Sequence, residues 1–360
     1  MRAQPQVLEK QGLSRMVLQP LAMGFRAGVA LRHVAYRHGW FRTRRLNCPV
    51  ISVGNLSVGG TGKTPMVAFI AEALLHRGWK PGILTRGYGR RHGTEVIAVE
   101  PGAGRAADPR VVGDEPALLA ARLLEVPIVI AANRYRAGLT AEERFGVNVH
   151  VLDDGFQHLA LARDLDVVLL DVTRDYSRAS LVPAGPLREP LASLARAQAV
   201  VLTRLELGDP LPLEEEVRRI NPGLKMFRST TRLRRLVEAA SGNERAADAL
   251  GGQPVGAFCG IGNPRAFFQD LQRWGFATVA ETAFPDHHPY RNGELVEQVR
   301  QATEAGATVL LTTEKDVMNF PREWKTTVPI LACVTEIELE PATAFDELLA
   351  SCIERSRTTN

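Results

Sequence analysis

The glycine-rich stretch at residues 54–65, GNLSVGGTGKTP, contains the residue types that bind a polyphosphate. Its glycines let backbone N–H groups turn inward around phosphate oxygens. The Lys63 ammonium group can neutralise the β- and γ-phosphate oxygens, and the Thr64 hydroxyl can ligate Mg²⁺. We therefore predict a nucleotide-binding loop (P-loop) that consists of Ser57, Val58, Gly59, Gly60, Thr61, Gly62, Lys63 and Thr64.

The flanking sequence places this loop between a strand and a helix. The β-branched run at residues 49–53 predicts a short strand, and apolar residues recur at helical spacing from Met66 to Leu74. The start of that helix adds a partial positive charge to the loop. Ser57 stands where the strict motif has glycine. An ordinary glycine-rich turn is the alternative, but Gly-Lys-Thr between a strand and a helix favours phosphate binding.

Two adjacent carboxylates, Asp153 and Asp154, follow the apolar strand predicted at residues 147–152. Carboxylates at the end of such a strand can hold Mg²⁺ directly or through water, opposite the threonine of the loop. An Asp-Asp-Gly turn without a metal is the alternative. The upstream P-loop favours the magnesium site.

Further polar side chains stand where predicted strands end or helices begin. Asp114 lies at a predicted helix start, where capping the helix is its simplest role. His287 follows Asp286 and can act as a base or an orienting partner, although an exposed polar loop is the simpler account of that segment alone. Comparable positions carry Arg86, Tyr88, Asn133, Arg134, Arg188 and Glu189.

Strand and helix patterns alternate along the chain and predict an α/β fold with a mostly parallel, doubly wound sheet. Sites on such sheets lie at the carboxyl ends of the strands, where these polar residues stand. A β-prone polar stretch near residues 227–237 predicts a hinge. We expect a basic segment at 1–48, a P-loop domain at 49–228 and a smaller α/β domain at 229–360.

The charge of the chain is concentrated at its start. The net charge is +4, but residues 1–48 hold nine Lys or Arg and one Glu, so the remainder is net acidic. From Pro20 to about Gly39 the pattern predicts an amphipathic helix with Arg26, His33 and Arg37 on one face. It can lie in a membrane interface or pack on its own domain, and the segment alone does not decide. The longest uncharged run there, ten residues, is too short to span a bilayer.

Nine motifs in this order resemble the tetraacyldisaccharide 4'-kinase family of lipid A biosynthesis. They are GNLSVGGTGKTP, ILTRGYGRR, VGDEP, NRY, LDDGFQH, LVPAGPLREP, GIGNP, FPDHH and TTEKD. The resemblance covers nearly the whole chain. The family has Thr or Ser where general P-loops have the first glycine, so Ser57 fits it.

This resemblance implies a two-domain P-loop kinase on the cytoplasmic face of the inner membrane, with residues 49–228 as the kinase domain. It would transfer the γ-phosphoryl group of ATP to the 4'-hydroxyl of an acylated glucosamine disaccharide 1-phosphate. Lys63 and Thr64 would bind phosphate and Mg²⁺, and Asp153 and Asp154 would organise the metal. The family pattern makes Asp114 the base and His287 its partner, with His288 as an alternative partner. The implied cleft residues are Arg86, Tyr88, Asn133, Arg134, Gln157, Arg188 and Glu189.

The expected partners are the lipid substrate and an anionic membrane surface that attracts the basic N-terminal segment. Nucleic acid and an obligate protein partner are not expected. Three alternatives stay open: a GTPase-like switch or metallochaperone, a nucleic-acid-binding ATPase, and a structural membrane protein with a degenerate P-loop. The chain has no Asn/Thr-Lys-x-Asp run for guanine, which argues against the GTPase-like switch. Its body is net acidic, which argues against the nucleic-acid-binding ATPase. Gly62, Lys63 and Thr64 are intact, which argues against a degenerate P-loop.

Overall fold

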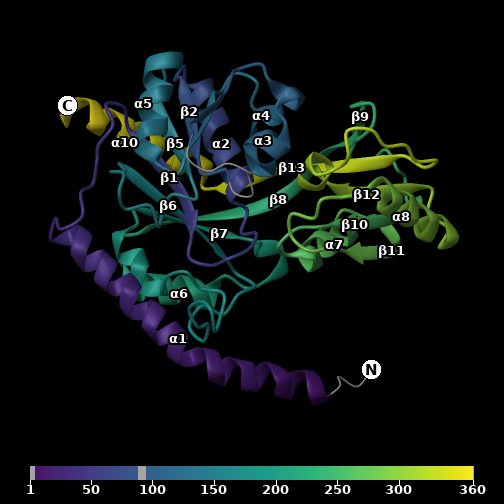
Figure 1. Ribbon diagram of the computed structural model, residues 1–360, viewed down its shortest axis with the longest axis horizontal. Helices are drawn as coiled ribbons and strands as arrows, with labels where there is room; N and C mark the ends of the chain where they lie inside the picture. Colours follow the sequence, from purple (N-terminus) through teal and green to yellow (C-terminus); the bar gives the residue numbers. More distant parts are fainter. Residues whose placement is uncertain (1–4, 88–94, 360) are drawn as a thin grey trace. The chain divides into compact units, whose positions relative to one another are not determined.

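The computed structural model describes residues 5–87 and 95–359 (Figure 1). Contacts group the chain into two compact units, each assembled from separate stretches. Unit 1 comprises Met1–Lys63, Leu152–Ser229 and Leu339–Asn360, and unit 2 comprises Thr64–Val151 and Thr230–Glu338. The domains expected from the sequence are continuous stretches, and their boundaries stay a prediction.

Unit 1 contains parallel strands in the order β8-β7-β6-β1. β1 and β6 pair in register from Ile51 with Leu165 to Asn55 with Leu169. Every residue of β1, β6 and β7 is buried, which explains why these strands read as almost continuous apolar runs. The elements of unit 1 are α1 (Pro5–Arg37), β1 (Val50–Asn55), β6 (Leu165–Asp171), η2 (Leu191–Arg196), β7 (Ala199–Thr203), η3 (Leu205–Leu207), α6 (Leu211–Ile220), the start of β8 (Lys225–Glu238) and α10 (Ala342–Thr359).

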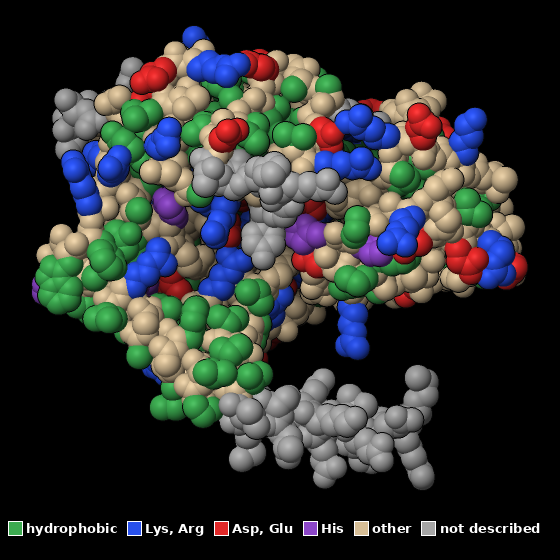
Figure 2. Space-filling model, in the orientation of Figure 1, with side chains coloured by type: hydrophobic (Ala, Val, Ile, Leu, Met, Phe, Trp, Pro, Cys, Tyr) green, Lys and Arg blue, Asp and Glu red, His purple; other side chains and the backbone are tan. Residues whose placement is uncertain are grey.

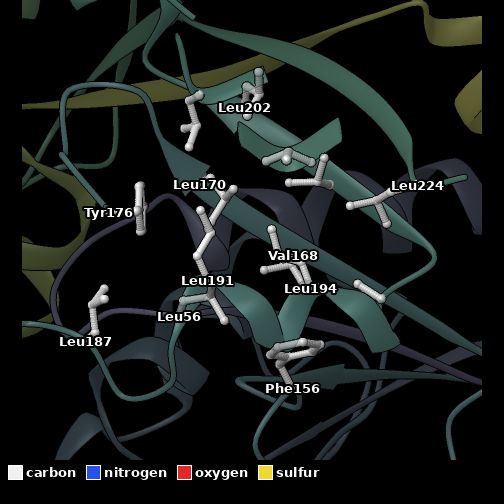
Figure 3. Close-up of a cluster of buried hydrophobic side chains, with 14 of the residues drawn as sticks. Leu56, Phe156, Val168, Leu170, Tyr176, Leu187, Leu191, Leu194, Leu202 and Leu224 are labelled. Carbon is white, nitrogen blue, oxygen red and sulfur yellow. The ribbon is translucent and has the colours of Figure 1, made fainter. Parts of the chain in front are cut away.

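A hydrophobic cluster fixes the loops of unit 1 (Figure 3). Val168 and Leu170 of β6 point to the same face because side chains alternate along a strand. They pack with residues of β7, η2 and α6 and with Leu187. Each fully buried leucine contributes about 1.5–3 kcal/mol. The cluster therefore holds Leu187 and Leu191 in place on either side of Arg188 and Glu189.

Helix α10 completes the packing of unit 1. Its Phe345 is fully buried and lies edge-on to Phe227 of β8, with the ring centroids 4.9 Å apart. Leu349 and Ile353 are also fully buried, one helical turn apart, as expected for the inner face of an amphipathic helix. Helix α10 is therefore part of the core of unit 1, to which Phe345, Leu349 and Ile353 contribute.

The first stretch of unit 2 forms strands in the order β5-β2-β4-β3. β2 and β4 are parallel, and β3 pairs antiparallel with β4. Gly82 of β2 is needed because a Cβ there would meet the Val147 side chain at 2.8 Å. The elements are α2 (Lys63–His76), β2 (Pro81–Thr85), β3 (Ile97–Val99), η1 (Gly104–Ala106), α3 (Pro109–Val112), α4 (Asp114–Arg122), β4 (Ile128–Ile130), α5 (Arg134–Phe145) and β5 (Val149–Asp153).

The second stretch of unit 2 forms strands in the order β11-β10-β12-β13-β8 (Figure 1). Helices α7 and α8 cover opposite faces of these strands, since Val255 and Ala257 of β10 pack with α7 whereas Phe258 packs with α8. The elements are β9 (Glu244–Ala246), β10 (Pro254–Cys259), α7 (Pro264–Arg273), β11 (Ala277–Ala283), α8 (Asn292–Glu304), β12 (Val309–Thr313), α9 (Glu314–Met318) and β13 (Ile330–Glu340).

The predicted α/β fold with mostly parallel strands is confirmed. The predicted start of the first helix is wrong, because α1 begins at Pro5 and Pro20 lies inside it. A proline removes one backbone hydrogen bond from a helix interior, a loss that this long helix tolerates. Within the described residues, no helix is both long and apolar enough to cross a membrane.

Candidate functional site

The P-loop follows β1 and leads into α2, which begins at Lys63. Gly59 and Gly62 have φ angles of 93° and 85°, which glycine adopts most easily, so these two positions need glycine. Asn55 Nδ2 donates a hydrogen bond of 2.7 Å to Thr61 Oγ1 inside the loop. The Val58 N–H donates to the Pro186 carbonyl at 2.8 Å, so the Pro/Gly loop at residues 182–190 supports the P-loop.

Two arginines that the sequence analysis missed also contact the P-loop. Arg174 Nη1 donates to the Val58 carbonyl at 3.1 Å, and Arg204 Nη2 donates to the Gly60 carbonyl at 3.0 Å. Both guanidinium groups lie near the buried carboxylate of Asp171, at 3.6 and 3.4 Å. Asp171 ends β6, so the carboxyl-end rule for parallel strands was the available signal.

The carboxylate of Asp154 contacts two cationic side chains, Lys63 and Arg188. Its Oδ2 accepts a hydrogen bond of 2.7 Å from Arg188 Nη1, and its Oδ1 lies 3.5 Å from Lys63 Nζ. Burial opposes ionisation of Asp154, but Lys63 and Arg188 outweigh it and lower the pKa of the carboxyl group. Asp154 is therefore a carboxylate at neutral pH. Its neighbour Asp153 is buried at the end of β5.

The residues present fit a hard cation such as Mg²⁺. Asp154 Oδ1 is buried and accepts no hydrogen bond from the described residues, so a lone pair is available. Carboxylate and hydroxyl oxygens are the ligands that Mg²⁺ prefers. Thr64, in the first turn of α2, supplies a hydroxyl.

Three of the predicted cleft residues lie in unit 1. Gln157 Nε2 donates to the carbonyl of Asn55, at the end of β1, at 2.9 Å. Arg188 binds Asp154, as described above. Glu189 is almost fully buried and pairs with Arg196 at 2.8 Å and with His33 at 3.5 Å. Burial raises the pKa of Glu189, but His33 and Arg196 outweigh it and lower that pKa overall.

Asp114 and His287 meet within unit 2, although 173 positions separate them. Asp114 begins α4 and is buried, and its Oδ2 lies 2.6 Å from His287 Nδ1. Asn319 Nδ2 donates a second hydrogen bond of 3.2 Å to the same oxygen. His288 does not take this place, because its Nε2 lies 3.2 Å from Glu294. The structure therefore brings His287, rather than His288, to Asp114.

Electrostatics couples this pair. Burial opposes ionisation of Asp114, but the hydrogen bond from His287 and the charge of Lys315 outweigh it and lower the pKa of the carboxyl group. The hydrogen bond to Asp114 raises the pKa of His287, while burial and Lys315 oppose that rise. The sequence analysis missed Lys315 and Asn319, although TTEKD at the end of a predicted strand was the signal for the lysine.

The remaining predicted cleft residues have other surroundings. Asn133 caps α5, since its Oδ1 accepts a hydrogen bond from the Arg136 N–H at 3.2 Å. Arg134 is buried, and its Nη1 donates to the Ala132 carbonyl at 3.0 Å. Arg86 is exposed directly after β2. Tyr88 lies outside the described residues. Their roles in a cleft stay predictions.

Comparison with known proteins identifies the family. A family model described as "Tetraacyldisaccharide-1-P 4'-kinase" matches residues 14–354. The chain belongs to this family. It is 36% identical over 349 residues to a tetraacyldisaccharide 4'-kinase of Syntrophus aciditrophicus, covering 93% of this chain and 92% of that one. The identity to the enzyme of the same name from Koribacter versatilis is 39% over 345 residues, covering 94% and 99%.

A solved structure of the family has the same fold. The crystal structure of LpxK from Aquifex aeolicus in complex with ATP is 31% identical to this chain, with a TM-score of 0.76. The match covers 94% of this chain and 99% of that one. The predicted family and the predicted enzyme class, a kinase, are therefore confirmed, whereas the roles of single residues stay predictions.

Proposed function

We propose that this kinase transfers the γ-phosphoryl group of ATP to the 4'-hydroxyl of a tetraacylated glucosamine disaccharide 1-phosphate, a step of lipid A biosynthesis. The observation that carries this proposal is the family match over residues 14–354. The P-loop and the Asp114–His287 pair supply the two chemical tasks that such a transfer needs, which are phosphate binding and proton acceptance.

At the ATP end of the reaction, the main task of the protein is to neutralise the negative charge of the phosphates. Phosphoryl transfer spreads negative charge over the transferred group, so cations and backbone N–H groups are its main catalysts. Lys63 would bind the β- and γ-phosphates, and Arg188 would hold Asp154 in place through its hydrogen bond of 2.7 Å. Thr64, Asp153 and Asp154 would hold Mg²⁺, which when bound adds positive charge beside the phosphates.

The acceptor side rests on Asp114 and His287. The 4'-hydroxyl must lose its proton as the new O–P bond forms, and the pair offers a carboxylate and an imidazole 2.6 Å apart to receive it. The lowered pKa of Asp114 makes it a weak base. A loose transition state tolerates a weak base because the proton leaves late.

The N-terminal segment would bind the protein to the membrane that holds its substrate. Ala22, Val29, His33 and Tyr36 of α1 are buried or half-buried. The rest of the segment exposes Leu21, Met23, Phe25, Leu31, Val34, Trp40 and Phe41. Figure 2 shows hydrophobic side chains gathered on this segment at the lower left of the view.

Exposed apolar side chains combined with basic ones suit an interfacial helix on anionic lipid. We assign the protein to the cytoplasmic face of the inner membrane, as a peripheral or monotopic enzyme. No nucleic-acid partner and no obligate protein partner is proposed.

The decisive experiment supplies γ-labelled ATP and a detergent-dispersed acylated glucosamine disaccharide 1-phosphate. Wild type should label the lipid, and Lys63→Ala should not. Hydrolysis of ATP or GTP without labelled lipid would contradict the proposal and favour a switch-like P-loop protein.

A further inference from the structure

The two ring nitrogens of His287 have different partners. Nδ1 lies 2.6 Å from Asp114 Oδ2, and Nε2 lies 3.3 Å from Lys315 Nζ. A lysine ammonium only donates hydrogen bonds, so Nε2 must act as the acceptor in this contact. The ring proton is then on Nδ1 and is donated to Asp114. This arrangement holds for the neutral imidazole, above the raised pKa of the ring, whereas a protonated ring would present its Nε2–H toward Asp286 Oδ2, 3.8 Å away.

Lys315 is held in place by two carboxylates besides its contact with His287. Its Nζ lies 3.0 Å from Asp286 Oδ1 and 3.8 Å from Glu115 Oε1. These two carboxylates fix the position of the ammonium group beside the ring. Its side chain is 18% exposed, so these contacts are partly shielded from water.

The backbone around His287 and Lys315 is tied together by Asp316. This buried carboxylate accepts hydrogen bonds from the Gly260 N–H at 2.7 Å and the Tyr290 hydroxyl at 2.8 Å. The carbonyl of Gly260 in turn accepts the His287 N–H at 3.1 Å. A Cβ at Gly260 would meet the Pro285 carbonyl at 2.9 Å, so glycine is needed here. These hydrogen bonds fix the distance between α9, which carries Lys315, and the loop that carries His287.

The charges around His287 explain why a cation is needed. Asp114 of α4 and Asp286 of its own loop are the carboxylates near the ring, and Lys315 of α9, which also lies 3.8 Å from Glu115, is the cation. His288 of the same loop contacts Glu294 instead. Without Lys315, the carboxylates of Asp114 and Asp286 would favour a second proton on the ring. Asp114 would then face an imidazolium and would be a poorer proton acceptor.

We propose that Lys315 is a positioning residue that acts through His287: its ammonium takes the place of the second ring proton, so that the Asp114–His287 pair can accept the proton of the 4'-hydroxyl. This inference rests on the roles proposed above for Asp114 and His287. The hydrogen bond to Asp114 raises the pKa of His287 overall, and the charge of Lys315 limits that rise.

The expected effect is measurable. A unit charge at 3.3 Å changes the pKa of the ring by about 1 when the effective dielectric constant is that of water, and by more at a lower one. Lys315→Met keeps the chain length and removes the charge, so it should raise the pKa of His287 by about that amount or more. Lys315→Arg keeps the charge and should leave the pKa near the wild-type value.

The experiment is NMR of the full-length enzyme with ¹⁵N-labelled histidine, in detergent, as a function of pH. His287→Gln assigns the signal, and Lys325→Met, an exposed lysine of the same unit, is the matched control. Above the pKa of the ring, wild type should show a neutral imidazole with its proton on Nδ1. An unchanged or lowered His287 pKa in Lys315→Met would overturn the proposal. Lys315→Gln replaces this variant if it does not fold.

A pH profile of kcat/KM separates this inference from the proposed function. In Lys315→Met the acidic limb should move to higher pH by the shift measured by NMR, since the ring is protonated at higher pH. If Asp114→Asn and His287→Gln retain full activity, the proposed roles of the pair are wrong. If these two variants are inactive but Lys315→Met has a wild-type profile, only the role of Lys315 is wrong.

Discussion

Glu189 offers the sharpest test of what holds the loop beside the P-loop. Its side chain is 3% exposed, and its carboxylate pairs with Arg196 Nη1 at 2.8 Å and His33 Nε2 at 3.5 Å. The Arg196 guanidinium also lies 3.6 Å from the centroid of the Phe156 ring. Glu189→Gln preserves the shape of the side chain and removes its charge, which leaves Arg196 without its anion.

The expected loss of stability follows from this geometry. Removing one partner of a buried ion pair costs about 3–5 kcal/mol. Arg196 keeps hydrogen bonds to the carbonyls of Ser193 and Phe156, and its side chain is 24% exposed, which reduces the cost. We therefore expect Glu189→Gln to lower the free energy of unfolding by about 2–3 kcal/mol. Glu215→Gln is the matched control, because its pair with Arg219 is exposed and should be worth less than about 1 kcal/mol.

The assay is urea unfolding followed by circular dichroism across a range of pH. Because the pKa of Glu189 is lowered in the folded state, its stabilising effect is present above its usual pKa and is lost as the pH falls through the folded value. The gap between wild type and Glu189→Gln should therefore close in acid. A gap below about 0.5 kcal/mol at neutral pH, with kinase activity lost, would refute the structural account and favour a direct role in the cleft.

Three further outcomes are expected. Lys63→Met should reduce lipid phosphorylation by about 10²–10³-fold because the transition state loses a cation. Urea unfolding measures whether the variant still folds. If the variant has lost its fold as well as its activity, the loss of activity is no evidence for a catalytic role of Lys63. Asp114→Asn should lower kcat by about 10²–10⁴-fold and leave ATP affinity unchanged, whereas loss of nucleotide binding in calorimetry would make Asp114 a nucleotide ligand. Met23→Glu with Leu31→Glu should weaken sedimentation with anionic vesicles at least about tenfold, while the exposed Leu211→Glu in α6 should not; equal effects would contradict membrane binding through α1.

The sequence predicted the features that depend on neighbouring residues. Gly-Lys-Thr between an apolar strand and a helix identified the P-loop, because the motif is itself a local structure. The same kind of reasoning placed Asp153 and Asp154 at the end of a buried strand, which the structure shows for Asp153, and their role at Mg²⁺ stays a prediction. Single-sequence reasoning reaches these features because strand period and turn chemistry act over a few positions.

Contacts between distant parts of the chain were not predictable in this way. Arg204 reaches Gly60 across 144 positions, and Asn319 reaches Asp114 across 205. No local pattern distinguishes these side chains from other surface arginines and asparagines. Asn133 also follows a strand, and its side chain caps α5, while the cleft role that the family resemblance implies for it stays a prediction.

The helix that completes unit 1 has a consequence for biosynthesis. Phe345, Leu349 and Ile353 of α10 are fully buried in unit 1, yet they follow β1 by nearly 300 positions. A ribosome therefore exposes the strands of unit 1 long before it has made α10, whose Phe345 packs on Phe227 of β8. The core of unit 1 is complete only once translation has passed residue 353, and until then its apolar strands are open to aggregation. A frameshift or premature stop that removes α10 would leave the P-loop sequence intact but the hydrophobic core of unit 1 incomplete. Quality-control proteases would degrade such a truncated protein.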